Sequence, residues 1–91
     1  MNINVRVPIS LQNITGNKTE FECQGDTLEE LLSNLKSLFP GIREILFDKG
    51  GKIRSSFCLF VNGKNVKLFN KEIIPLNDGD EVFIMQLVAG G

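Results

Sequence analysis

The last four residues of the chain, Val88-Ala89-Gly90-Gly91, carry the most distinctive chemistry in the sequence. Because glycine supplies ~7% of average sequences, a random ending would read Gly-Gly in roughly one chain in two hundred. Glycine has no Cβ, so a Gly-Gly segment can thread a channel too narrow for other residues and approach a nucleotide closely. The carboxylate of Gly91 could then be activated as an acyl adenylate. A frayed tail or a cloning remnant is the alternative interpretation.

The side chains offer no second reactive centre. Histidine, the commonest general base and a frequent metal ligand, is absent from the sequence. Cys23 and Cys58 lie far apart with no CxxC spacing, and Gly50-Gly51 lacks the Lys-Ser/Thr context of a phosphate-binding loop. We therefore predict no catalytic residue, no metal site and no bound cofactor, which indicates a protein that is not itself an enzyme.

Length and composition are typical of one globular domain. The chain has 91 residues, of which 42% are apolar and 23% charged, and its formal net charge is −1. Lysines and acids are interspersed, Trp and Tyr are absent, and no apolar run approaches the ~18 residues needed to span a membrane. Residues 1–5 lack the features of a signal peptide. We therefore expect a cytoplasmic protein with reduced thiols and without a nucleic-acid or membrane partner.

Alternating apolar residues predict an antiparallel hairpin at the start of the chain. The connecting loop, residues 10–17, is longer than an ideal hairpin turn, so we expect its tip to be mobile. We expect Cys23 in the core as a small hydrophobic residue, and Cys58 in more open surroundings. The inward positions of the two strands are Ile3, Val5, Val7, Thr19, Phe21 and Cys23.

Residues 28–39 have the period of an amphipathic helix. Asp26 or Thr27 can cap this helix, and Thr27 with Glu30 has the spacing of a capping box. Pro40-Gly41 ends it, and a further helical turn could follow. The apolar stripe, which we expect to face the core, consists of Leu28, Leu31, Leu32, Leu35, Leu38 and Phe39.

The second half of the sequence predicts three more strands. The β-prone run 57–61 is closed by Asn62-Gly63, a strong hairpin signal, and residues 66–68 continue as a short edge strand. A tight turn at residues 77–80 leads into the last strand, residues 81–88. If one sheet is to cover the helix, the first and last strands must pair at its centre. The predicted fold class is therefore α+β, a β-grasp with a mixed sheet packed on one main helix.

Several short motifs occur in a fixed order along this predicted fold. They are Gly25-Asp26-Thr27-Leu28 at the start of the helix, Phe39-Pro40-Gly41-Ile42 at its end, Val61-Asn62-Gly63, Leu76 followed by Asp78-Gly79-Asp80-Glu81-Val82, and the closing Val88-Ala89-Gly90-Gly91. In this order and spacing the sequence resembles the MoaD/ThiS family of ubiquitin-like sulfur carriers over nearly its whole length. It is most similar to the carriers that supply sulfur for cysteine synthesis. It departs from them at Met85-Gln86-Leu87, where relatives often carry proline.

The resemblance implies a division of labour between this chain and two enzymes. A ubiquitin-activating-type adenylyltransferase would join Gly91 to AMP from ATP, and a sulfur donor would then leave a C-terminal thiocarboxylate. A sulfur-accepting synthase (a cysteine synthase, a molybdopterin synthase large subunit or a thiazole synthase) would take up the sulfur. The chain would be one ubiquitin-like domain, residues 1–91, with a flexible Gly-Gly tail over about residues 87–91 that presents Gly90 and Gly91 to these partners.

Strand parity predicts a docking face for these partners. Inward and outward positions alternate along residues 57–61 and 81–88, which places large apolar side chains on the outer face of the sheet. Such residues need no partner in general, but their position beside a reactive tail favours an interface. The residues expected there are Phe60, Phe83, Met85 and Leu87. The acids Asp78, Asp80 and Glu81 could add charge complementarity or simply be solvated in a surface turn.

Three functions are compatible with the sequence, and a sulfur carrier is favoured. A protein modifier that joins Gly91 to lysines of target proteins would share the fold and the activation chemistry. A plain interaction domain, with an incidental Gly-Gly ending, is the third. The pathway, whether cysteine, molybdenum cofactor, thiamin or transfer-RNA thiolation, would be determined by the partner enzymes rather than by this chain.

Overall fold

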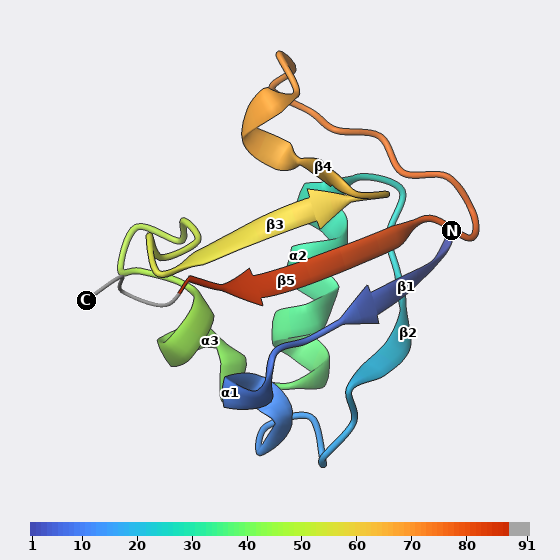
Figure 1. Ribbon diagram of the computed structural model, residues 1–91. Helices are drawn as coiled ribbons and strands as arrows, with labels where there is room; N and C mark the ends of the chain where they lie inside the picture. The colour runs from blue at the N-terminus through green and yellow to red at the C-terminus, as the bar shows by residue number, and fades with distance from the viewer. Residues whose placement is uncertain (88–91) are drawn as a thin grey trace.

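The computed structural model of the chain describes residues 1–87, which form a five-stranded mixed sheet packed on one main helix (Figure 1). The strand order is β2-β1-β5-β3-β4, and the central pair, β1 and β5, is parallel. The remaining neighbours are antiparallel. The strands are β1 (Asn2–Arg6), β2 (Glu20–Gln24), β3 (Phe57–Val61), β4 (Lys64–Asn65) and β5 (Glu81–Gln86). The predicted β-grasp, with the first and last strands paired at its centre, is confirmed.

The main helix, α2 (Leu28–Leu38), begins where the sequence predicts it. Of the two candidate caps, Thr27 is the one used, since its hydroxyl accepts a hydrogen bond from the Glu30 amide at 3.2 Å. The apolar stripe is shorter than predicted, because Leu38 is 56% exposed. Phe39 closes this end of the helix instead, and its ring packs edge-on against Phe21 with centroids 5.0 Å apart.

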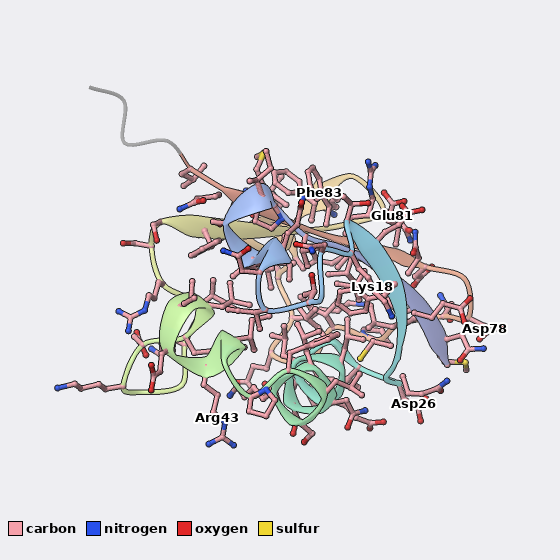
Figure 2. All side chains as sticks on the ribbon, turned by 90° about the horizontal axis from the view of Figure 1, so that it is seen from below. Lys18, Asp26, Arg43, Asp78, Glu81 and Phe83 are labelled. Carbon is pink, nitrogen blue, oxygen red and sulfur yellow. The ribbon has the colours of Figure 1, made fainter. Side chains whose placement is uncertain are left out.

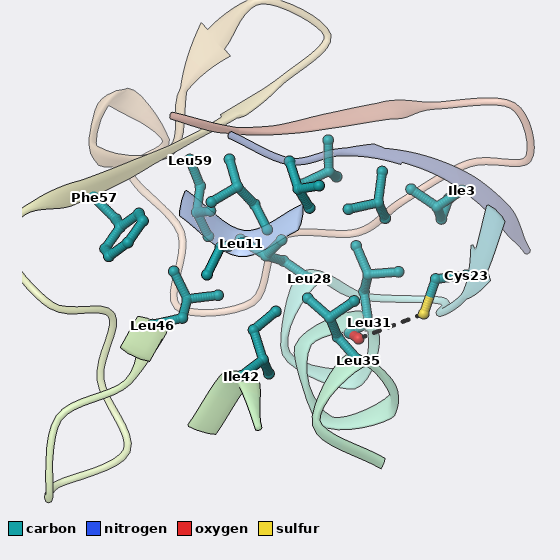
Figure 3. Packing of buried hydrophobic residues seen from close by; sticks show 14 of the residues in the cluster. Ile3, Leu11, Cys23, Leu28, Leu31, Leu35, Ile42, Leu46, Phe57 and Leu59 are labelled. Atoms are coloured by element: carbon teal, nitrogen blue, oxygen red, sulfur yellow. Dashed lines mark hydrogen bonds between the residues drawn. The ribbon is translucent and has the colours of Figure 1, made fainter. Parts of the chain in front are cut away.

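The core lies between the inner face of the sheet and α2, and a second short helix, α3 (Ile42–Leu46), closes one end of it (Figure 3). The single helical turn predicted after Pro40-Gly41 is therefore confirmed. Cys23 is 2% exposed and its thiol faces the Leu31 carbonyl oxygen at 3.9 Å, as the dashed line in Figure 3 marks. Burial raises the pKa of the Cys23 thiol, which keeps it protonated at neutral pH. Its predicted place in the core is confirmed.

The segment between β1 and β2 is more ordered than the plain loop predicted from the sequence. It contains a helical turn, α1 (Ile9–Gln12), whose Leu11 side chain is fully buried. Thr15 is also buried, and its hydroxyl donates to the Lys18 carbonyl oxygen at 2.9 Å. The prediction failed because it relied on Gly and Asn as turn signals and overlooked a single leucine that could reach the core.

Residues 66–68, predicted as an edge strand, form a 3₁₀ helix, η1 (Val66–Leu68), instead. The Asn65 side chain accepts a hydrogen bond from the Lys67 amide at 3.0 Å, and this local bond diverts the chain from the sheet after the two residues of β4. The predicted hairpin turn is confirmed, because Asn62 and Gly63 have φ values of 50° and 84°. No helix within residues 1–87 is long and apolar enough to cross a membrane.

The glycine at position 25 is required by a close backbone approach. A Cβ at Gly25 would lie 2.8 Å from the Cα and Cβ atoms of Leu31, where α2 crosses the end of β2. We predict that Gly25→Ala lowers the free energy of unfolding by about 1–3 kcal/mol, because helix or strand must shift. Gly41→Ala is the matched control, since a Cβ there would meet Ile14 at an ordinary 3.6 Å. Urea denaturation of both variants measures the difference, and equal stabilities would contradict the prediction.

Candidate functional site

The end of β5 is where the structure brings the chain toward the C-terminal residues predicted to be reactive. The amide of Leu87 donates to the Ser56 carbonyl oxygen at 2.7 Å, so the chain leaves the sheet beside the residues that precede β3. Figure 1 shows this point near α3 and at the opposite end of β5 from the N-terminus. The predicted strand 81–88 ends at Gln86, and Leu87 is 46% exposed. Residues 88–91, which include the predicted Gly90 and Gly91, lie outside the described residues.

The two faces of β5 differ as strand parity predicts. Val82 and Ile84 are fully buried in the core, whereas Phe83 and Met85 are half-buried on the outer face. Phe60 is the register partner of Phe83 on the neighbouring β3, and their ring centroids are 6.4 Å apart. The structure thus brings together three of the four residues predicted for an interface, and Leu87 follows them at the end of the strand. That a partner binds there stays a prediction.

A cation borders this apolar group. The Arg6 guanidinium of β1 lies 5.5 Å from the centroid of the Phe83 ring, and its Nε is 3.6 Å from a Glu20 carboxylate oxygen. Both Arg6 and Glu20 are more than half exposed, so this ion pair contributes little to stability. The sequence analysis missed Arg6, although parity could have found it, because Arg6 alternates with the inward-facing Val5 and Val7. We call Phe60, Phe83, Met85 and Arg6 the outer-face patch.

Cys58 is on the outer face, as predicted, but it is 7% exposed rather than open. It is paired in register with Met85 and borders a cavity of about 90 Å³, whose lining also includes Val66 and Lys67 of η1. Because η1 turns back over β3 instead of extending the sheet, it covers the position that a flat edge strand would have left exposed. Cys58 and Cys23 are both free thiols.

Two of the three acids that could add charge complementarity, Asp78 and Asp80, have structural roles in the turn before β5. An Asp78 carboxylate oxygen accepts from the Asn2 amide at 2.7 Å. Asp80 accepts from the Asn77 amide at 2.7 Å and from the Asn62 side-chain amide at 3.0 Å. These bonds join the turn to the first strand and to the β3–β4 hairpin, which explains why acids occupy these positions. Within residues 1–87, no three His, Cys, Asp or Glu side chains are grouped so as to hold a metal ion.

The architecture defines a ubiquitin-like β-grasp protein, in which the last strand is central and carries the tail out of the domain. Comparison of sequences then gives the family. The profile of the ThiS family matches residues 5–91, nearly the entire chain. This chain belongs to the ThiS family, and the family resemblance inferred from the motifs is confirmed.

Individual relatives agree with this assignment. The sulfur carrier protein CysO of Mycobacterium tuberculosis is 34% identical over 93 residues, which cover 100% of both chains. Its crystal structure superposes with a TM-score of 0.85, covering 96% of this chain and 100% of that one. CysO of Amycolatopsis orientalis, solved in complex with BexX, gives a TM-score of 0.85 at 28% identity, covering 98% of this chain and 99% of that one. Small archaeal modifier protein 1 of Methanosarcina acetivorans shares the fold, with a TM-score of 0.84 at 24% identity over 99% of this chain and 96% of that one.

The two faces of β5 should respond in opposite ways to a buried charge. We predict that Ile84→Asp unfolds the domain, with a loss of more than about 4 kcal/mol, because its carboxylate would have no partner in the core. Phe83→Asp should cost only about 1 kcal/mol, since that position is partly solvated and Arg6 can pair with the new charge. Thermal unfolding followed by circular dichroism distinguishes the two. A folded Ile84→Asp beside an unfolded Phe83→Asp would mean that the faces are inverted.

Proposed function

We propose that this protein is a sulfur carrier whose Gly91 carboxylate is adenylated by a partner enzyme and then converted to a thiocarboxylate. The observation that carries the proposal is the ThiS family match, which extends through residue 91 and so includes Gly90 and Gly91. Identity of 34% over the whole length to a protein named as a sulfur carrier supports the same role. The chain acts as a substrate of its partners and contributes no catalytic group.

The chemistry takes place entirely at the terminus. A carboxylate oxygen of Gly91 attacks the α-phosphorus of ATP on the activating enzyme, and pyrophosphate leaves. A donor at the oxidation level of sulfide then attacks the acyl carbon and displaces AMP, so that one carboxylate oxygen departs with AMP and sulfur takes its place. The thiocarboxylate is a good nucleophile, and an accepting synthase transfers its sulfur to a biosynthetic intermediate. Cysteine, molybdopterin, thiamin and thiolated transfer RNA are the candidate products.

The outer-face patch would dock on the activating enzyme and the synthase in turn. Its position supports this role, because β5 contributes Phe83 and Met85 to the patch and leads directly into the tail. An apolar contact at Phe83 and Met85 would anchor the domain while the following residues reach the active site. The rigid β5 would then determine where the tail begins, and the length of the tail would determine how far Gly91 reaches.

A protein modifier would use the same activated terminus. The likeness to an archaeal modifier rests on 24% identity and therefore extends to the fold alone. The relative with identity above 30% over its full length is named as a sulfur carrier, which favours the carrier function. In both functions the first step is adenylation of Gly91, so the experiments must examine the product as well as the activation.

The terminus is tested by blocking it. We predict that removal of Gly91, or extension of the chain beyond it, abolishes ATP-dependent pyrophosphate exchange by the activating enzyme. Thermal stability should stay within about 0.5 kcal/mol of the unaltered protein, because terminal residues make few buried contacts. A blocked chain that still consumed ATP and accepted sulfur would contradict the proposal.

Intact mass spectrometry of the activated protein supplies the second readout of this experiment. A carrier should show a species in which sulfur replaces one oxygen. A modifier should instead appear as conjugates on other proteins, and trypsin would leave on the target lysine a remnant of 20 residues, because Lys71 is the last cleavable position. Abundant branched peptides without a thiocarboxylate would favour the modifier.

The docking role of the outer-face patch is tested with the variant that keeps its fold. We predict that Phe83→Asp weakens binding to the activating enzyme by roughly 2 kcal/mol or more, because a charged side chain replaces an apolar contact and must lose water in the interface. Calorimetric titration of the enzyme measures the change, and Glu22→Lys, an exposed substitution in β2, serves as the control. Unchanged binding by a folded Phe83→Asp would exclude this face.

A further inference from the structure

The charges of this protein are separated along the sequence, although its net charge is only −1. Residues 36–71 contain eight of the ten Lys and Arg side chains but only two of the eleven Asp and Glu. Lysines and acids are therefore not evenly interspersed along the chain, which corrects the description in the sequence analysis. The rest of the chain is correspondingly acidic, with nine of the eleven Asp and Glu and only two of the ten Lys and Arg. The electrostatic field of the folded domain depends on where each of these segments lies in the fold.

Four of these cations gather at one end of the molecule. Arg43 is on α3, Lys49 and Lys52 are in the turn that follows it, and Arg54 comes directly after that turn. The Arg54 amide donates to the Leu46 carbonyl oxygen at 2.9 Å, and its Nε donates to the Glu44 carbonyl oxygen at 3.2 Å. These bonds hold the turn against α3. We call Arg43, Lys49, Lys52 and Arg54 the basic rim.

The charge of the basic rim is not neutralised by ion pairs. All four side chains are exposed, and neither of the two salt bridges found within residues 1–87 involves them. The nearby Asp48 carboxylate accepts from the amides of Gly50 and Lys52, at 2.9 and 3.0 Å, and so serves the turn. Lys36 adds a fifth cation to this end of the molecule, with its ammonium 4.0 Å from the centroid of the Phe47 ring.

Several acidic residues lie toward the other end, whereas Glu44 and Asp48 lie beside the basic rim. In Figure 2, Asp26, Asp78 and Glu81 are on the side away from Arg43. Asp26 is 3.1 Å from the N-terminal ammonium, and Asp78 accepts from the Asn2 amide, so these carboxylates surround the start of the chain. The positive end is the one from which the tail departs, because Leu87 is bonded to Ser56, two residues after Arg54.

Three of the four residues of the basic rim, Arg43, Lys49 and Arg54, also line a hollow. A cavity of about 260 Å³ is lined by Arg43, Glu44, Phe47, Asp48, Lys49 and Arg54. Three cationic side chains and two carboxylates thus line one concave surface, and the net charge of its lining is +1, from three positive and two negative groups. A carboxylate entering it could accept paired hydrogen bonds from a guanidinium, which an ammonium alone cannot offer.

We infer that the basic rim docks against acidic residues at the entrance through which the activating enzyme receives the tail. This inference rests on the proposed function, since it names the enzyme that binds Gly91. A negative potential at that entrance attracts the positive end of the domain and repels the acidic end, so the domain arrives tail first. The rim complements the outer-face patch, because charge orients the encounter and apolar contact holds the complex.

Adenylation kinetics test the inference with a matched pair of charge reversals. Lys49→Glu is expected to lower kcat/KM of the activating enzyme roughly fivefold at about 0.01 M salt, where the Debye length is about 30 Å. The difference should disappear at about 1 M salt, where that length is about 3 Å. kcat should stay unchanged, because the variant alters encounter rather than chemistry. Lys18→Glu changes the net charge equally outside the basic segment and should have little effect.

The outcomes distinguish this inference from the proposed function. If the unaltered protein is not adenylated, the proposed function fails and the inference fails with it. If the protein is adenylated but Lys49→Glu behaves like Lys18→Glu at every salt concentration, only the inference is overturned. It is also overturned if Lys49→Glu loses binding to a single-stranded RNA probe while its adenylation is unchanged, because the rim would then be a nucleic-acid surface. Equal thermal stabilities of both variants exclude an effect of folding.

Discussion

The parallel pairing of β1 with β5 is the interaction on which the rest of the structure depends. It joins the two ends of the sequence at the centre of the sheet, with Val5 opposite Val82 and both side chains fully buried. Backbone hydrogen bonds extend this pairing into the turn before β5. The Asn4 amide donates to the Asp80 carbonyl oxygen at 2.9 Å, and the Gly79 amide donates to the Asn2 carbonyl oxygen at 2.9 Å. A pairing so distant in sequence costs chain entropy, which burial of the inner face against α2 offsets.

Central placement also gives β5 two tasks at once. Its inward residues complete the core, while its outward residues Phe83 and Met85 supply half of the outer-face patch and its end leads toward the C-terminus. Because side chains alternate along a strand, a slip of one residue would exchange these sets. The Asp80 side chain opposes such a slip, since it is bonded both within the turn and to Asn62 of the neighbouring hairpin. The turn motif that marks the family therefore contributes to holding the register of β5, the strand that precedes the tail.

Patterns of regular period predicted most of this fold, and isolated side chains account for most of the errors. The bounds of β3, the Asn62-Gly63 turn and the Thr27 cap follow from local chemistry that the sequence displays directly. Leu11 and Asn65 act through contacts that no periodic pattern reveals, one by reaching the core and the other by bonding to the next turn. Likewise, parity placed Phe60, Phe83 and Met85 on one face, but the burial of Cys58 depends on where η1 packs.

The chemistry of such a carrier imposes a limit on its surface. A terminal carboxylate is the same in every protein, so an enzyme that selects this chain must recognise the folded domain. The outer-face patch by itself would discriminate poorly, since apolar contact accepts many shapes. The basic rim lies at the same end of the domain, on α3 and the residues that follow it rather than on the sheet. Its positive charge distinguishes this chain from a β-grasp protein that is acidic at that end. In this proposal, the two surfaces near the end of β5 would together specify both the identity of the domain and the direction in which its tail enters the activating enzyme.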